Sequence, residues 1–490
     1  MKTMKRVYHV IGIALLSLTL LMGCDGHSTP SEHLSRAENF FDEGNYKAAS
    51  IELKNLLRQN PEHARARFLM GLLNLELKDG LSAEKELNKA KELGVDNKSI
   101  LPPMARALIL QNDYQGVLDL GVDQAQDWEP KPKANFMVSR GLALLALGRK
   151  DESLDAIDNA FGSDPTSPYV LLAKARLMMV NGEIAEARTV LNRLFEIKDN
   201  YGPAWSFLGD VERFEGNLES AEAAYGKAIE YNQEARTDLL NRAMIRIELN
   251  RFEEAQEDID RLAKLAKNNP NIDYAKGLLH FQRKEYADAQ AAFGSVLSAN
   301  TDYLPAVLYA GIAHFMLGNQ ETAESYLKQY VESVPNYLPA NRVLALIKLR
   351  KKEFKAAERL IRNAVGDDEM DVFTLTLLAN ALLGQNRIPE AMVYLQKVVA
   401  IQPEFAPARF NLGLNLLRQG DTEAGVTELE TAIELDTELQ LGVVQLVVIY
   451  LNNKEFDKAL ETALAYRDQK GDASAYLLLG SVYMARKEME

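Results

Sequence analysis

Small residues recur along this chain every 34 residues, and this period constrains the fold more than any other feature of the sequence. One column of alanines and glycines begins at Ala37 and Gly71 and continues, with a single step of 36 residues, to Gly413. A second column, mostly alanine, follows twelve residues later, from Ala49 to Ala459. A chain of 490 residues with this period is expected to fold as stacked copies of one unit.

The unit resembles the tetratricopeptide repeat, a pair of antiparallel helices. Its key positions are filled most fully by Trp205, Leu208, Gly209, Ala221, Tyr225 and Ala228. Helices approach closely only where side chains are small, so both small-residue columns are predicted to lie at helix–helix contacts. The expected fold class is all-α: a tetratricopeptide-repeat solenoid, a right-handed superhelix of helix pairs without β-strands.

A third column marks the turn inside each pair. Its members favour left-handed backbone: Gly44, Gly148, Gly182, Gly216, Gly318, Gly420, Asn112, Asn250 and Asn386. Such residues end a helix where the chain turns sharply into the next one. We therefore expect each first helix to end at this column.

These columns predict thirteen helix pairs over residues 31–472 and the first helix of an incomplete fourteenth repeat over 473–490. A solenoid usually ends with a polar capping helix. Here Tyr476, Leu479, Val482 and Tyr483 are expected to be uncovered on one face. Either the chain is part of a longer array, or another element covers that end.

The third repeat is irregular, because Pro102 and Pro103 fall inside its expected first helix and "DWEPKPK" adds two residues before the next pair. Proline fits the first turn of a helix, so this helix is expected to begin near Pro102 and to be shortened. A local change of curvature is favoured over a domain boundary, since no long Gly/Ser linker accompanies the insertion.

The N-terminus has the layout of a signal peptide: Lys2, Lys5 and Arg6 precede an apolar run from Val7 to Met22. "LMGC", ending at Cys24, resembles a bacterial lipobox. Cleavage before Cys24 and lipidation of its thiol would make residues 1–23 the signal peptide, residues 24–30 a lipidated tether and the lipid the membrane anchor. The alternative is a buried cysteine in an N-terminal helix that nothing nearby covers.

Charge and cysteine content exclude other classes. Removal of residues 1–23 takes the formal net charge from −14 to −17, which argues against nucleic-acid binding through a basic surface. Cys24 is the single cysteine, so no intramolecular disulfide can form. Packing alone is expected to stabilise the chain.

Four stretches carry a more specific resemblance: "AASIELKNLLRQNPEHARARFLMGLLNLELKDGLSAEKELNKAKELGVD", "ILPPMARALILQNDY", "DYAKGLLHFQRKEYADAQAAF" and "LPAVLYAGIAHFMLGN". Together with the lipobox they resemble the tetratricopeptide-repeat lipoprotein family of the PEP-CTERM/exosortase system, specifically its N-terminal half. The resemblance implies an envelope lipoprotein that works alongside exosortase sorting and exopolysaccharide production. It carries over no catalytic residues.

The sequence indicates no enzyme, cofactor or metal site. The H-E-x-x-H, C-x-x-C, G-x-S-x-G and P-loop motifs are all absent. One column reads Glu212, Arg246, His280, His314 and Lys348 through five successive repeats. A metal or proton-relay site at the two histidines is one interpretation. A polar ladder between helices is favoured, because equivalent positions lie about 10 Å apart.

Binding is the expected activity, since stacked pairs leave a groove lined by their first helices. The candidate groove residues are Tyr274, Leu278, Phe281, Leu308, Ile312, Phe315, Leu346, Phe373 and Phe410. Such a lining suits an apolar helix or an extended protein segment. The alternative is that tight winding packs these residues against one another.

Two functions follow: a membrane-tethered scaffold for protein partners, and a polysaccharide-handling subunit of an envelope export apparatus. The scaffold is favoured, because the lining has few of the polar groups that sugar sites use. Possible partners are exosortase or exopolysaccharide-export components. Asp25, directly after Cys24, resembles a signal that retains lipoproteins in the inner membrane, so a periplasm-facing inner-membrane location is favoured over the outer membrane.

Overall fold

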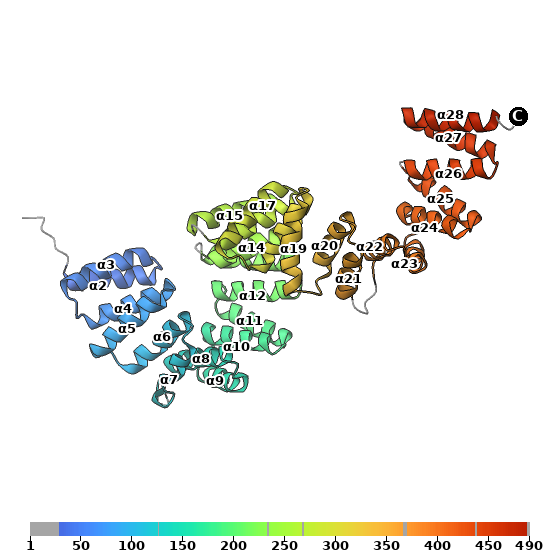
Figure 1. Ribbon diagram of the computed structural model, residues 1–490. Coiled ribbons are helices and arrows are strands. Elements are labelled where there is room, and N and C mark those ends of the chain that lie inside the picture. The colour runs from blue at the N-terminus through green and yellow to red at the C-terminus, as the bar shows by residue number, and fades with distance from the viewer. Residues whose placement is uncertain are drawn as a thin grey trace, which may run out of the picture. The chain divides into compact units, whose positions relative to one another are not determined.

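A computed structural model describes residues 29–125, 127–232, 235–266, 269–365, 370–436 and 439–487. Every regular element within these ranges is a helix (Figure 1). The chain forms two compact units, one ending at Ile245 and one beginning at Arg246, so the division falls inside helix α14. The predicted all-helical repeat fold is confirmed, and each unit is described below by itself.

The first unit holds six complete helix pairs. In each pair an even-numbered first helix packs against the second helix that follows it. The helices are α2 (Pro30–Asp42), α3 (Tyr46–Gln59), α4 (Ala64–Glu76), α5 (Gly80–Glu92), α6 (Asn97–Leu110), α7 (Tyr114–Asp119), the 3₁₀ helix η1 (Asp123–Ala125), α8 (Pro130–Ala146), α9 (Lys150–Ser163), α10 (Pro168–Val180), α11 (Ile184–Ile197), α12 (Gly202–Phe214), α13 (Leu218–Tyr231) and most of α14 (Arg236–Glu248).

The second unit continues the alternation to α28. Its helices are α15 (Phe252–Leu265), α16 (Pro270–Gln282), α17 (Tyr286–Ala299), α18 (Leu304–Met316), α19 (Gln320–Ser333), α20 (Leu338–Arg350), α21 (Phe354–Val365), α22 (Val372–Gly384), α23 (Ile388–Ile401), α24 (Ala406–Gln419), α25 (Thr422–Leu435), α26 (Gln440–Asn452), α27 (Phe456–Lys470) and α28 (Ala473–Lys487). First helices of successive repeats also contact one another, as α16 contacts α18.

The two small-residue columns lie at the helix–helix contacts, as predicted. Ala37, Ala221 and Ala289 have no exposed surface. Large side chains from the facing helix fill the space above the small residues, so that Phe293 lies against Gly277. Each unit therefore has a continuous series of small hydrophobic cores, and their interfaces depend on local size matching.

The turn column is confirmed and is more complete than the sequence indicated. The six glycines have φ between 74° and 89°, and the three asparagines have φ of 58° or 59°. Four lysines occupy the same column with positive φ: Lys78, Lys284, Lys352 and Lys454. Lysine is not a left-handed residue by preference. The packed helices on either side impose this backbone, so residue type alone could not reveal it.

The prediction that the first helix of the third repeat begins near Pro102 and is shortened is wrong. Helix α6 begins at Asn97, before the two prolines, where the Asp96 side chain accepts the backbone N–H of Ser99 at 2.9 Å. Burial of Ile100 and Leu101 offsets the hydrogen bonds that Pro102 and Pro103 cannot donate. The shortened helix is the second of the pair, α7, which has six residues.

The face of α28 is less open than expected. Leu479 and Val482 are buried against the preceding helices, in a core that includes Ala459. Tyr476 and Tyr483 are exposed, in agreement with the prediction. Half of the predicted face therefore packs inward, because a helix of this kind contacts its predecessor with one side only.

Candidate functional site

The nine predicted groove residues lie on the first helices α16, α18, α20, α22 and α24 of the second unit. Leu278 and Leu308 are buried, with 8% and 6% of their surface exposed. Tyr274, Phe281, Ile312, Phe315, Leu346 and Phe410 are half-buried. Phe373 is 47% exposed and is the most accessible of the set.

Aromatic side chains of this region pack against one another. The ring of Phe281 lies 5.1 Å from that of Tyr309 in an edge-on contact, and Tyr309 stacks on Phe293 at 5.7 Å. Tyr274 meets Tyr303 edge-on at 5.4 Å. Burial raises the pKa of both Tyr274 and Tyr309, so their hydroxyls stay neutral. From α16 to α18, these contacts are the ones expected if tight winding packs the candidate groove residues against neighbouring side chains.

Arginines cover the more open aromatic rings. The Arg350 guanidinium lies 4.8 Å from the ring centre of Phe315, and that of Arg342 lies 5.7 Å from Phe373. Arg342 also donates to Asp371 at 2.6 Å. The lining is therefore more polar than the sequence pattern suggested, because long cationic side chains from neighbouring positions lie over it.

An exposed apolar series lies in the first unit, where the sequence reasoning did not place one. Leu110, Ala146, Val180 and Phe214 are the last residues of α6, α8, α10 and α12, and all four are exposed. Successive members of these four helices contact one another. We call the four residues the unit-1 stripe. Its signal in the sequence was a column five residues after the first small-residue column.

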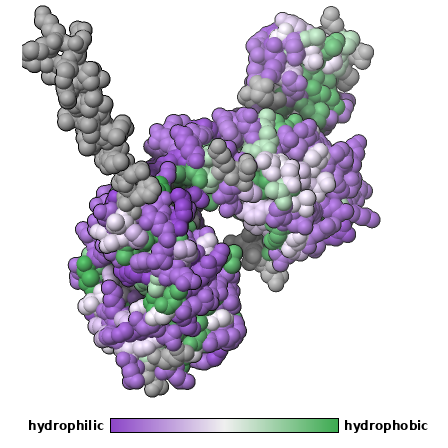
Figure 2. All heavy atoms as spheres, turned by 90° about the vertical axis from the view of Figure 1, so that its left-hand side faces the viewer, coloured by the Kyte–Doolittle hydropathy of each residue, from purple (hydrophilic) through white to green (hydrophobic). Residues whose placement is uncertain are grey.

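The three larger side chains of the unit-1 stripe are all well exposed. Leu110 is 41% exposed, Val180 is 48% exposed and Phe214 is 69% exposed. On the face shown in Figure 2, hydrophobic residues form separate patches within a mostly hydrophilic surface. Single exposed apolar residues are common, whereas a row of them on adjacent helices indicates a contact surface.

The polar column at Glu212 to Lys348 pairs its members in two ways. Arg188 on α11 binds Glu212, and four repeats later Glu324 on α19 binds Lys348, with the charges exchanged. Hydrogen bonds from Arg188 hold the pKa of Glu212 below its usual range. These two pairs join a second helix to the next first helix, as a polar ladder would.

The other members of the column bind within their own helix pair. Arg246 donates to Asp258 at 2.8 Å, and His280 Nδ1 lies 2.7 Å from Glu285. His314 stacks on Tyr326, with ring centres 5.7 Å apart. Each histidine thus has its own local partners. Among the described residues, one group of possible metal ligands forms around His280 and is considered below.

The N-terminal predictions concern Cys24 and Asp25, which lie outside the described residues. Within the part of the chain that is described, no helix has both the length and the apolar character needed to cross a bilayer. The lipid anchor and the membrane location therefore stay predictions.

Comparison with known proteins shows the family. Residues 34–96 and 138–201 match the tetratricopeptide repeat model, and residues 176–467, more than half of the chain, match the model of intraflagellar transport protein 56. The chain belongs to the tetratricopeptide-repeat proteins. Its region 176–467 is similar to intraflagellar transport protein 56.

This tetratricopeptide-repeat protein has distant relatives. A TPR repeat-containing protein of Methanocaldococcus jannaschii is 21% identical over 76% of this chain and 70% of the relative. Hsp70-Hsp90 organizing protein 1 of Glycine max is 25% identical over 50% of this chain, but the match spans only 38% of that protein. The solved APC/C hetero-tetramer Cut9-Hcn1 contains a chain similar over 95% of this one, with 14% identity, 98% coverage of that chain and a TM-score of 0.45.

Proposed function

We propose that this protein is a non-enzymatic scaffold, tethered to a membrane through Cys24, whose first helices bind protein partners. The observation that carries this proposal is the unit-1 stripe, an exposed apolar row on four successive first helices. Membership of the tetratricopeptide-repeat family supports a scaffold role. No catalytic residues and no cofactor are proposed.

The spacing of the unit-1 stripe suits an extended partner segment. Packed helices lie about 8–10 Å apart. A polyproline II segment has three residues per turn, so every third side chain points to the same side and successive ones lie about 9 Å apart. A partner segment with an apolar side chain at every third position would place one side chain on each of Leu110, Ala146, Val180 and Phe214. Arg176, exposed on α10 four residues before Val180, would add a cationic contact beside the row.

The second unit offers a further surface of different character. Phe373 and the half-buried Phe315 each lie beneath an arginine. Partner binding there would compete with these cation–π contacts, so we assign the main apolar contact to the first unit. Tyr274, Leu278 and Leu308 are too enclosed to contribute more than support.

The membrane location and the pathway that we propose for this protein rest on the sequence. The lipobox and the family resemblance favour a periplasm-facing lipoprotein of the inner membrane that works alongside exosortase sorting and exopolysaccharide production. Tethering would raise the effective concentration of membrane partners, so a weak binding surface would suffice. The alternative function is a polysaccharide-handling subunit of an envelope export apparatus.

Phe214→Asp combined with Val180→Asp tests the binding surface. Both side chains are exposed ends of helices, so the fold should persist, which circular dichroism would verify. Capture of partners by crosslinking in the native host should fall at least about tenfold relative to wild type, since a buried charge is costly. Leu81→Asp, at a 71% exposed position on α5, is the matched control and should capture normally.

Three results would oppose the proposal. Capture of the same proteins by the double variant would remove the unit-1 stripe from the binding surface. A loss of capture in Leu81→Asp as well would indicate a general effect of surface charge. Retention of glycan and no protein would favour the polysaccharide-handling alternative.

A further inference from the structure

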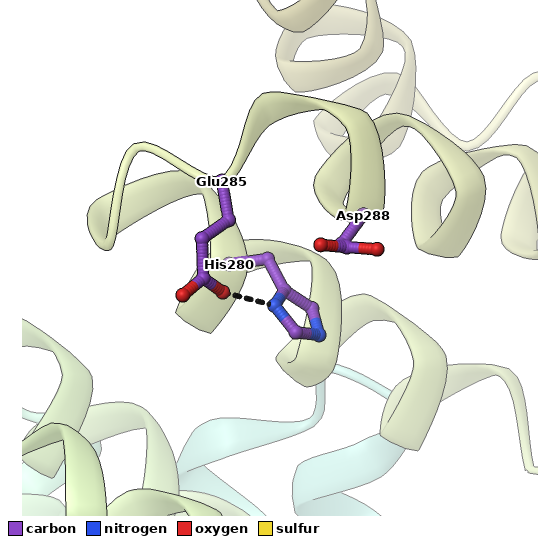
Figure 3. A group of neighbouring side chains, drawn as sticks. All are labelled: His280, Glu285 and Asp288. Atoms are coloured by element: carbon purple, nitrogen blue, oxygen red, sulfur yellow. Dashed lines mark hydrogen bonds and ion pairs between the residues drawn. The ribbon is translucent and has the colours of Figure 1, made fainter.

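Three side chains with metal-binding atoms meet at the turn between α16 and α17. His280 is near the end of α16, Glu285 immediately precedes α17, and Asp288 lies in the first turn of α17. Their ligand atoms all lie within 4.8 Å of one another. Figure 3 shows the three side chains gathered around one space at this turn.

The backbone brings these side chains together. Lys284, with φ of 62°, makes the left-handed turn that reverses the chain after α16. The turn carries Glu285 back beside His280, where its carboxylate lies 2.7 Å from Nδ1. Two rigid helices hold the remaining ligands, so a bound ion would need little rearrangement of the backbone.

The donor set suits a divalent transition metal. An imidazole nitrogen and two carboxylate oxygens are common zinc ligands, and the two carboxylates neutralise a doubly charged ion. An imidazole ligand favours Zn²⁺ over Mg²⁺, which prefers oxygen and water. The nearby Arg283 guanidinium is bound to Glu253 at 3.1 Å, so its charge is partly compensated there.

We propose that His280, Glu285 and Asp288 bind one divalent transition-metal ion, represented by Zn²⁺, and so link α16 to α17. The ion displaces the hydrogen-bonded proton between His280 and Glu285, which is released to solvent, and gains Asp288 as a third ligand. The site is open to solvent at Glu285 and Asp288, which leaves coordination positions for water. Its affinity is therefore expected to be micromolar, below that of a closed structural zinc site.

The neighbouring repeats lack this ligand set. In the next repeat the equivalent positions are His314, Asn319 and Thr322, which retain the imidazole without the carboxylates. In the preceding repeat they are Arg246, Arg251 and Glu254. All three repeats have these three equivalent positions at the turn of the helix pair. Only the repeat that contains His280 has a metal-binding side chain at each of the three.

Titration of the purified full chain with Zn²⁺ by isothermal calorimetry tests the proposal. Wild type should bind one more ion than either His280→Gln or Asp288→Asn. Both variants keep the hydrogen-bonding capacity and size of the side chain, so the fold should persist. His314→Gln is the matched control and should bind as wild type does. Mg²⁺ should give no saturable heat at this site.

A gain of function provides the second test. Asn319→Glu combined with Thr322→Asp would give the next repeat the same three ligands around His314. The number of Zn²⁺ ions bound should rise by one. A stoichiometry that does not change would contradict the geometric basis of the proposal.

Equal Zn²⁺ binding by wild type and His280→Gln would overturn the assignment. Graded uptake that no variant alters would show adventitious binding to surface carboxylates only. Loss of one ion in His314→Gln but not in His280→Gln would assign the ion to the next repeat and exclude the site at His280.

Discussion

The ring of Tyr225 on α13 lies directly over Gly209 on α12: a Cβ atom added to Gly209 would stand 2.6 Å from ring carbon Cδ1. The Tyr225 hydroxyl donates to Asp210 at 2.7 Å, which holds the ring in place. The same arrangement recurs two repeats later, where a Cβ on Gly277 would lie 2.5 Å from Phe293. Tyr225 and Phe293 each stand sixteen positions after a glycine of the first small-residue column. Their rings fit against the facing helix only because that glycine has no side chain.

Gly209→Ala should destabilise the protein. The added methyl group would collide with a ring that is fully buried and hydrogen-bonded, so overpacking should lower the free energy of unfolding by about 1–3 kcal/mol. Thermal unfolding measures the change. Gly162→Ala in α9 is the control, because nothing lies within 4 Å of its Cβ position, and there alanine should raise stability slightly. An unchanged melting temperature for Gly209→Ala would contradict the packing.

Lys352→Gly should stabilise the protein. Lys352 has φ of 60°, a left-handed backbone that costs an L-residue about 1–2 kcal/mol and glycine almost nothing. Part of that gain is lost to the greater entropy of glycine in the unfolded chain, so a net gain of about 0.5–1 kcal/mol is expected. Lys355→Gly, in helical backbone three residues later, should instead lose stability. Chemical denaturation of both variants measures the change in the free energy of unfolding. A loss of stability in Lys352→Gly would contradict the prediction.

Asp238→Asn should increase stability at neutral pH. Asp238 is 8% exposed and accepts the hydroxyl of Ser206. Burial, opposed by that hydrogen bond, raises the pKa of Asp238 above its ordinary value, so the folded protein binds the proton more tightly than the unfolded chain does.

This raised pKa determines the pH dependence. Burying the charged form of Asp238 lowers the free energy of unfolding. This loss is absent below about pH 3.9, the pKa of aspartate in the unfolded chain, and develops as the pH rises through the higher pKa of Asp238 in the folded protein. The advantage of asparagine should therefore vanish in acid and reach a plateau near neutral pH, as thermal melts across that range would show. An advantage that does not change with pH would indicate a packing effect.

Cys24→Ser should abolish lipidation. Without the thiol no diacylglycerol can be attached, so the chain should accumulate as uncleaved precursor or as unanchored material. Metabolic labelling with palmitate measures the modification. Label that persists in the variant would exclude Cys24 as the anchor.

Asp25→Ser should move the protein toward the outer membrane. The expectation follows from the resemblance of Asp25 to an inner-membrane retention signal. Fractionation of native-host membranes measures the distribution, with wild type expected in the inner membrane. If wild type is already in the outer membrane, the inner-membrane scaffold is wrong and a role in export becomes the better hypothesis.

The repeat period was readable because it acts locally. Each helix pair contacts mainly its neighbours, so a small residue required at one interface is required again 34 residues later. The sequence alone therefore places Gly209 and Ala221 at helix contacts. The same reasoning located the left-handed turns wherever glycine or asparagine occupied them.

Other features depended on neighbours that the period does not specify. Lys284 shares the left-handed turn because the packed helices impose the backbone on a residue that does not prefer it. Phe281, a candidate groove residue, packs on Tyr309, while Phe214, in a column for which the sequence predicts no groove, is open to solvent. Exposure depends on which side chains from adjacent helices fill the space.

The repeat period also could not predict which side chains would gather around His280. Its column suggested a relation to His314 in the next repeat, yet its ring lies beside Glu285 and near Asp288 of its own helix pair. Periodicity identifies equivalent positions, which are spaced one repeat apart. The tight left-handed turn between α16 and α17 decides which side chains come within ligand distance, because it reverses the chain over only a few residues.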